Sequence, residues 1–156
     1  MRQDVSLYEK KIEEYGALMS ANSRYGDIRL AEDHWTLKEM IGHLVDSASN
    51  NHQRFVRLQL QEELVFPGYG EEDWRRVSRV NDLDYRFLTD FWRSCNQFLI
   101  HLIRNMEPES LNHVWKSPGG DLTLGFLVED YFGHMDWHMD LFERRAGEIR
   151  KSGQAG

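Results

Sequence analysis

Four stretches of the chain place apolar residues at steps of three and four, which is the spacing of one face of an α-helix. These stretches cover residues 1–20, 36–61, 84–106 and 123–145. The first of them contains Val5, Tyr8, Ile12, Tyr15 and Met19. Helices that each carry one apolar face bury those faces most simply against one another. The sequence therefore predicts an all-α fold, a four-helix bundle with antiparallel neighbours.

The second helix has the clearest start in the sequence. Thr36 and Glu39 have the spacing of a capping box, in which the threonine hydroxyl accepts a backbone N–H and the glutamate accepts the N–H of the cap residue. Trp35 just before the cap and Met40 at the fourth helical position can form a hydrophobic staple. The apolar pattern predicts that this helix continues to about Gln61.

The connections before and after the third helix are longer than a minimal bundle needs, and long connections often carry function. Residues 67–70, Pro-Gly-Tyr-Gly, must interrupt regular structure. A short helical turn is expected around Trp74. Residues 113–122 contain Ser-Pro-Gly-Gly, which predicts a turn and allows a short hairpin before the last helix.

The length of 156 residues suits a single domain, expected at residues 1–150, and the Gly-rich polar residues 151–156 are expected to be a flexible tail. The net charge of −7 argues against a nucleic-acid partner. We find neither a secretion signal nor an apolar run near the roughly 18–20 residues of a membrane span, so we expect no membrane partner and a cytoplasmic location. The single cysteine, Cys95, lies within the apolar pattern of the third helix and is expected to be a buried apolar residue.

Two histidines lie four residues apart in the fourth helix, where their Cβ atoms are roughly 5–6 Å apart on one face. The series Leu127, Tyr131, His134, His138 and Leu141 steps by 4, 3, 4 and 3, so both imidazoles share the inward face. Burying two imidazoles without partners is costly. A shared metal ion at about 2.0–2.1 Å would satisfy one nitrogen of each ring.

A third histidine, His43, begins a polar line that continues through Ser47, Asn50 and Arg54 at steps of 4, 3 and 4 along the second helix. The small residues at 47–49 predict free volume beside His43. This line is either the wall of a pocket or a helix edge that meets solvent, and the residues alone leave both readings open. The remaining histidines are assigned surface or structural roles: His34, His52, His101 and His113.

Several short motifs in this order resemble the DinB/YfiT-like family of metalloenzymes, in particular its YfiT branch, over residues 30–142. They are WTLKE at 35–39, HLVDS at 43–47, NHQRF at 51–55, Pro67, Trp74 and YFGHMDWH at 131–138. The resemblance implies a four-helix bundle that binds a divalent metal through His43, His134 and His138. Zinc is the metal expected first, with nickel, iron or manganese as alternatives. The resemblance also implies a homodimer.

Related proteins include thiol-dependent S-transferases and isomerases, and others that are labelled hydrolases. The resemblance therefore favours an S-transferase whose partners are a small-molecule thiol and an electrophile, with the metal converting the thiol to the reactive thiolate. A hydrolase is the first alternative, in which the metal lowers the pKa of bound water toward about 7. A non-catalytic, metal-stabilised stress or binding protein is the second.

Other polar residues are candidates for supporting roles. Asp46, three residues after His43, is interpreted as a group that holds an imidazole; a fourth ligand and a solvated surface residue are the other readings. Ser47 and Asn50 are candidate substrate-binding residues. Arg54, about 16 Å from His43 along the helix axis, is either a holder for an anionic part of the substrate or a surface arginine. Asp130, one turn before His134, is the other candidate imidazole partner.

Overall fold

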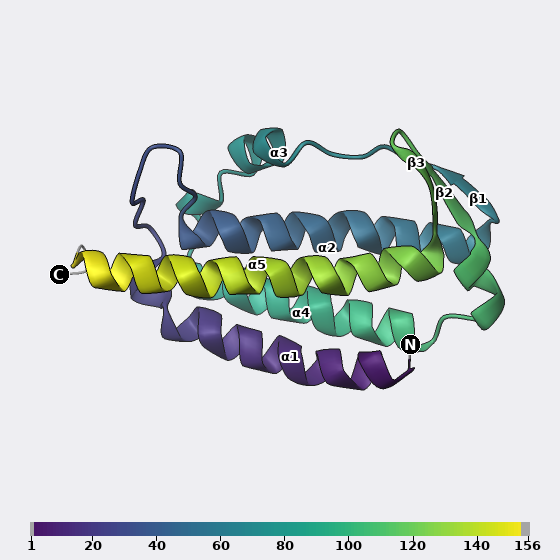
Figure 1. Ribbon diagram of the computed structural model, residues 1–156, viewed down its shortest axis with the longest axis horizontal. Helices are drawn as coiled ribbons and strands as arrows, with labels where there is room; N and C mark the ends of the chain where they lie inside the picture. The colour runs from purple at the N-terminus through teal and green to yellow at the C-terminus, as the bar shows by residue number, and fades with distance from the viewer. Residues whose placement is uncertain (1, 154–156) are drawn as a thin grey trace.

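A computed structural model describes residues 2–153 and confirms the all-α bundle (Figure 1). The helices are α1 (Arg2–Ala21), α2 (Leu37–Leu60), α3 (Glu71–Ser78), α4 (Tyr85–Arg104) and α5 (Leu124–Ser152). Among them, α3 is the short helix predicted around Trp74, and the other four form the bundle. Helix α4 packs against α1 and α2, while α5 packs against α2.

The direction of the helices differs from the predicted antiparallel arrangement. Figure 1 shows α2 and α4 running from left to right, whereas α1 and α5 run from right to left. The packed neighbours α2 and α4 are therefore parallel. Parallel neighbours need a connection that returns along the full length of a helix. Residues 61–84 provide it, which is the physical reason why this connection is long.

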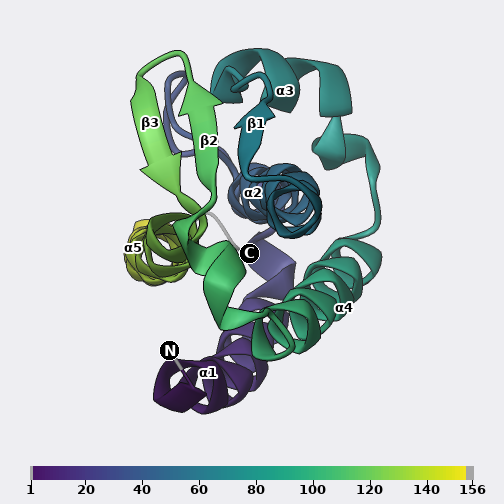
Figure 2. The ribbon, with the colours of Figure 1, turned by 90° about the vertical axis from the view of Figure 1, so that its right-hand side faces the viewer.

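A small three-stranded sheet lies at one end of the bundle, beside α2 and α5 and away from α1 (Figure 2). Strands β2 (Val114–Ser117) and β3 (Gly120–Thr123) form the predicted hairpin. Strand β1 (Glu63–Val65) was not predicted, because three residues are too few to show an alternating pattern. It pairs in parallel with β2, with Leu64 opposite Trp115. The sheet thereby joins the two long connections to each other.

The predicted starts of α2 and α5 are confirmed. The Thr36 Oγ1 atom accepts the Glu39 N–H at 3.1 Å, and the Thr36 N–H donates to the Glu39 carboxylate at 2.8 Å. Thr123 caps α5 by accepting the Phe126 N–H at 3.2 Å.

The end of α5 lies further along the chain than the predicted residue 145. Ala146 and Ile149 are buried and continue the apolar face, so the helix reaches Ser152. The first part of the expected tail at residues 151–156 is thus helical, and residues 154–156 lie outside the described residues.

The core between the helices includes Phe55, Trp92 and Phe142, whose side chains are fully buried. Phe91 and Phe98 belong to the same apolar pattern of the third helix as Cys95, which predicts an inward position, but they are 46% and 55% exposed. Helix α4 contacts α1 and α2 but leaves one flank to solvent, and these rings lie on that flank. In the described part of the chain, no helix has the length and apolar character that crossing a membrane requires.

Candidate metal centre

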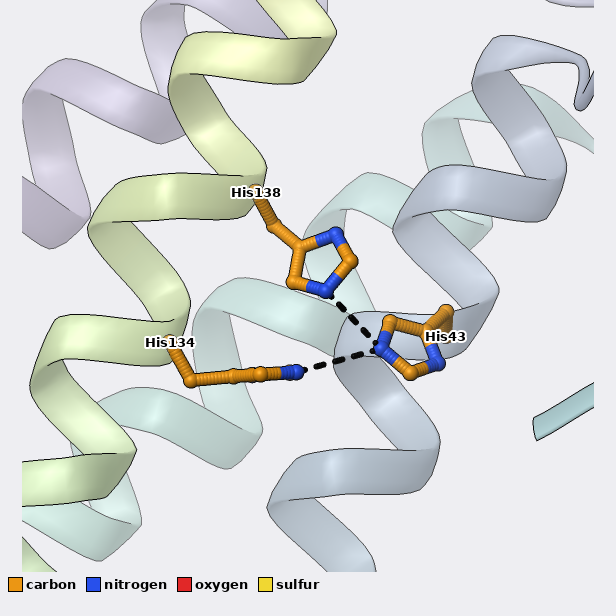
Figure 3. A group of neighbouring side chains, drawn as sticks. All are labelled: His43, His134 and His138. Atoms are coloured by element: carbon orange, nitrogen blue, oxygen red, sulfur yellow. Dashed lines mark hydrogen bonds between the residues drawn. The ribbon is translucent and has the colours of Figure 1, made fainter. Parts of the chain in front are cut away.

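Three of the seven histidines meet between α2 and α5 (Figure 3). His43 lies in the second turn of α2, and its Nε2 atom is 3.3 Å from Nε2 of His134 and 3.1 Å from Nε2 of His138. One ligand atom from each ring lies within 4.8 Å of the other two. The antiparallel contact of α2 with α5 brings these rings together although His43 is 91 and 95 residues away from the other two in sequence. The predicted triad is therefore assembled by the fold.

The spacing of the His43 nitrogen from the other two fits a divalent metal ion. Nitrogen ligands at 2.0–2.1 Å from a tetrahedral metal are about 3.3–3.4 Å apart, close to the separations of 3.1 and 3.3 Å observed here. His43 and His138 are buried and His134 is half-buried. No carboxylate or thiolate of the described residues joins the cluster. Three imidazole donors would leave at least one coordination position for a small molecule.

The surroundings of the rings keep them neutral, which is the form that binds a metal. Burial lowers the pKa of His43 to about 4, and repulsion from His134 adds to the effect. Burial together with repulsion from His134 and His43 lowers the pKa of His138 to about 3. Burial also lowers the pKa of His134, although the charges of Asp130 and Glu71 act in the opposite direction.

These shifts predict how the metal-free protein responds to acid. Between pH 6.5 and 5 the unfolded chain protonates histidines that stay neutral in the folded protein, so stability falls as the pH falls. Asp46 acts in the opposite direction, because burial raises its pKa to about 6. We expect a net loss of about 2 kcal/mol over this range, measured by urea unfolding of chelator-treated protein. An Asp46→Asn variant should lose more, and a flat profile in both proteins would contradict the expectation.

Two tryptophans that the sequence analysis did not assign to the site flank the histidines. The rings of Trp35 and His43 pack edge to face with their centroids 5.5 Å apart, and those of Trp137 and His138 do so at 4.7 Å. Both indoles line a cavity of about 250 Å³ that also touches His138. The position of Trp137 directly before His138 was the available sequence signal. The cavity gives the centre a small compartment with aromatic walls.

The polar residues that follow His43 along α2 lie in the interior of the protein. Ser47, Asn50 and Arg54 are buried, so the line along α2 is an interior surface and not a solvent-facing edge. The Asn50 amide donates to the Asp46 carbonyl of its own helix at 2.9 Å. Whether Ser47 and Asn50 bind substrate stays a prediction.

Asp46 is not brought into the histidine cluster. It lines a separate cavity of about 300 Å³ between α2 and α4, together with Ala48, Ser49 and the half-buried Cys95. The free volume predicted beside His43 therefore opens toward α4 instead. Among the described residues, no hydrogen bond joins Asp46 or the exposed Asp130 to a histidine of the site, and the buried Nδ1 atom of His134 has no partner.

The rotation of α5 about its axis is fixed from its other side. The Asp136 carboxylate accepts the hydroxyl groups of Tyr8 and Tyr15 and the ammonium group of Lys11, each at 2.6 Å. All three donors come from α1. Because Asp136 lies midway between His134 and His138 in sequence, this contact with α1 helps to hold both imidazoles toward α2.

Known proteins are similar to this chain in sequence and in architecture. The DinB superfamily profile matches residues 21–141. A candidate metal-dependent hydrolase of Oceanobacillus iheyensis is 23% identical over 123 residues, 78% of this chain and 71% of that protein. A protein of the same description from Halalkalibacterium halodurans is 22% identical over 107 residues, 69% of this chain and 60% of its own length.

Two solved structures share the fold. YfiT from Bacillus subtilis, a candidate metal-dependent hydrolase with an unusual four-helix bundle topology, superposes with a TM-score of 0.71 at 19% identity and covers 94% of this chain and 90% of YfiT. A mycothiol-dependent maleylpyruvate isomerase superposes with a TM-score of 0.61 at 14% identity, covering 95% of this chain but 57% of the isomerase. With its profile match, its bundle and its histidine cluster, the chain belongs to the DinB superfamily and is YfiT-like.

Proposed function

We propose that this protein is a divalent-metal-dependent S-transferase, which joins a low-molecular-weight thiol through its sulfur atom to a small electrophile. The observation that carries the proposal is the convergence of three neutral imidazole nitrogens beside a cavity with aromatic walls. The fold shared with a mycothiol-dependent isomerase supports the choice of a thiol as the nucleophile.

A divalent metal held by the three imidazoles would supply Lewis acidity that lowers the pKa of a bound thiol. His43, His134 and His138 would hold the ion without adding negative charge, which would preserve that acidity. Trp35 and Trp137 line the cavity beside the histidines and offer an apolar surface to the electrophile. In the transfer, the sulfur forms a bond to the electrophilic carbon, the leaving group departs with its electron pair, and the thiol proton passes to solvent.

A metal-dependent hydrolase is the second candidate, because both curated relatives and YfiT are described in those terms. The same three imidazoles suit it, with water in place of the thiol. The two candidates differ in the nucleophile that they need. A hydrolase cleaves an activated ester without added thiol, whereas a transferase requires the thiol.

The experiment begins with protein purified without a metal-affinity tag and analysed for its metal content. Metal-loaded and chelator-treated samples are then assayed with an aryl halide plus a thiol panel, and separately with activated esters. We expect thiol conjugation at least about tenfold faster in the loaded sample. Equal rates with and without metal would contradict a metal-dependent enzyme, and metal-dependent ester cleavage alone would favour the hydrolase.

A further inference from the structure

Arg54 is a buried cation without an anionic partner. Arg54 is 7% exposed, and the central carbon of its guanidinium lies 3.9 Å from the centroid of the Trp115 ring. The Nη1 atom donates a long hydrogen bond of 3.4 Å to Asn51 Oδ1. The Nε atom is buried without a hydrogen-bond partner, and among the described residues no carboxylate oxygen lies within 4 Å of the guanidinium. An unpaired buried charge is costly, which indicates a missing partner.

This cation belongs to the same side of the molecule as the histidines. Arg54 and His43 are eleven residues apart on α2, which is about 16 Å along the helix axis. Long side chains on a helix lean toward its N-terminus, so the guanidinium lies closer to His43 than the Arg54 backbone does. Burial lowers the pKa of Arg54, while electrostatic interactions with Tyr69 and Asp130 act against the shift. Asp130 also acts on His134, so one carboxylate is close enough to influence both groups.

The side chains along this line are neutral and polar. Ser47 and Asn50 are buried between His43 and Arg54 on the polar line of α2. Trp115 fixes the plane of the guanidinium, and the edge formed by Nε and Nη2 makes no hydrogen bond within the described residues. A planar guanidinium edge of this kind matches the two oxygens of a carboxylate.

We propose that Arg54 binds a carboxylate of the molecule that reacts at the histidine centre, so that the natural thiol or electrophile is an anion with its carboxylate remote from the reacting atom. This inference rests on the proposed function and adds to it a substrate class. Arg54 acts as the binding residue, Trp115 orients it, and the distance between the guanidinium and the histidines selects the length of the substrate.

A series of ω-mercaptoalkanoic acids of increasing chain length tests the proposal against the corresponding amides. The full chain is loaded with cobalt(II), and thiolate binding is followed by the sulfur-to-cobalt absorption band. In the native protein we expect the acid to bind at least about tenfold more tightly than the amide at one preferred chain length, as a charge-assisted bidentate contact should. Arg54→Met should reduce this ratio to less than about twofold at every length, with the metal content unchanged.

Two further variants make the comparison specific. Arg54→Lys keeps the charge but loses the planar fork, so its acid-to-amide ratio should be intermediate. Arg57→Met removes an exposed arginine from the next turn of the same helix, where it bonds Gln53 at 3.1 Å, and should leave the ratio unchanged. Equal binding of acids and amides by the native protein at every chain length would overturn the proposal.

A second readout does not depend on thiol chemistry, and the titration itself uses the native protein. The ¹⁵N–¹H resonance of Arg54 Nε, identified by its loss in Arg54→Lys, is followed in native zinc-loaded protein during titration with straight-chain alkanoates that carry no thiol. A saturable shift supports a carboxylate site, and its absence overturns it. If the resonance shifts but no thiol gives the cobalt band, the carboxylate site stands and the proposed thiol chemistry fails.

Discussion

His138→Ala is expected to bind a divalent metal at least about 100-fold more weakly than the native protein, because even the loss of a residue that only supports a ligand costs 10–100-fold. The substitution removes one of three donors whose nitrogens meet within 4.8 Å. The two remaining imidazoles can hold the ion only in a more open site. Elemental analysis after dialysis against a weak chelator measures the effect, with about one ion per native chain and almost none in the variant.

The matched control is His101→Ala, which removes an exposed histidine of α4 outside the cluster and should leave metal content unchanged. Circular dichroism and thermal unfolding of the metal-free proteins separate loss of a ligand from loss of the fold. His138→Ala should unfold close to the metal-free native protein, since the substitution removes a buried imidazole that burial and the neighbouring His134 and His43 make costly to protonate. Full metal content in a folded His138→Ala protein would refute the assignment of the site.

Glu39→Ala is expected to lower the free energy of unfolding by about 3 kcal/mol, because it leaves buried donors without an acceptor. The Glu39 carboxylate accepts the Thr36 N–H at 2.8 Å, Arg29 at 2.7 Å, Arg75 at 2.9 Å and Asn81 at 3.0 Å. These bonds tie the start of α2 to α3 and to the turn that follows it. This loss of unfolding free energy is at the low end of the range for breaking a buried ion pair, because both arginines are partly exposed.

Urea unfolding of Glu39→Ala across a pH series checks both the size and the origin of this effect. Burial would raise the pKa of Glu39, but Arg29, the Thr36 N–H and Arg75 outweigh it and the net shift is downward. The stabilisation is therefore present above the ordinary carboxyl value of 4.5 and is lost as the pH falls through the lowered folded value. Asp73→Ala, which breaks an exposed pair with Arg76, should have almost no effect. An equal effect of both substitutions at neutral pH would contradict this explanation.

The helix starts and the histidine pair could be predicted because their signals are local. A capping box spans four residues, and His134 and His138 share a face whatever the helix packs against. The meeting of His43 with that pair came from the family resemblance, since nothing local to α2 reports which helix faces it. In that sense the sequence predicted the candidate site more fully than the topology that builds it.

The remaining features depend on contacts between distant segments. The parallel packing of α2 and α4 decides that Phe91 and Phe98 face solvent and that Ala48 borders a cavity on the α4 side. The burial of Arg54 depends on Trp115, which the hairpin brings over α2 from 61 residues further along the chain. The apolar periodicity of one helix indicates neither which other helices pack against it nor which of its residues a distant hairpin will bury.

The three metal-ligand candidates are separated along the chain by the long connections between α2 and α5. His43 lies before these segments, and its partners lie 91 and 95 residues later. Cleavage of the chain anywhere between α2 and α5 would leave each fragment with an incomplete set of donors. Two such fragments could rebuild the site only by associating, so the ion would act as a reversible clamp between them, and the bundle could serve as a split-protein metal sensor.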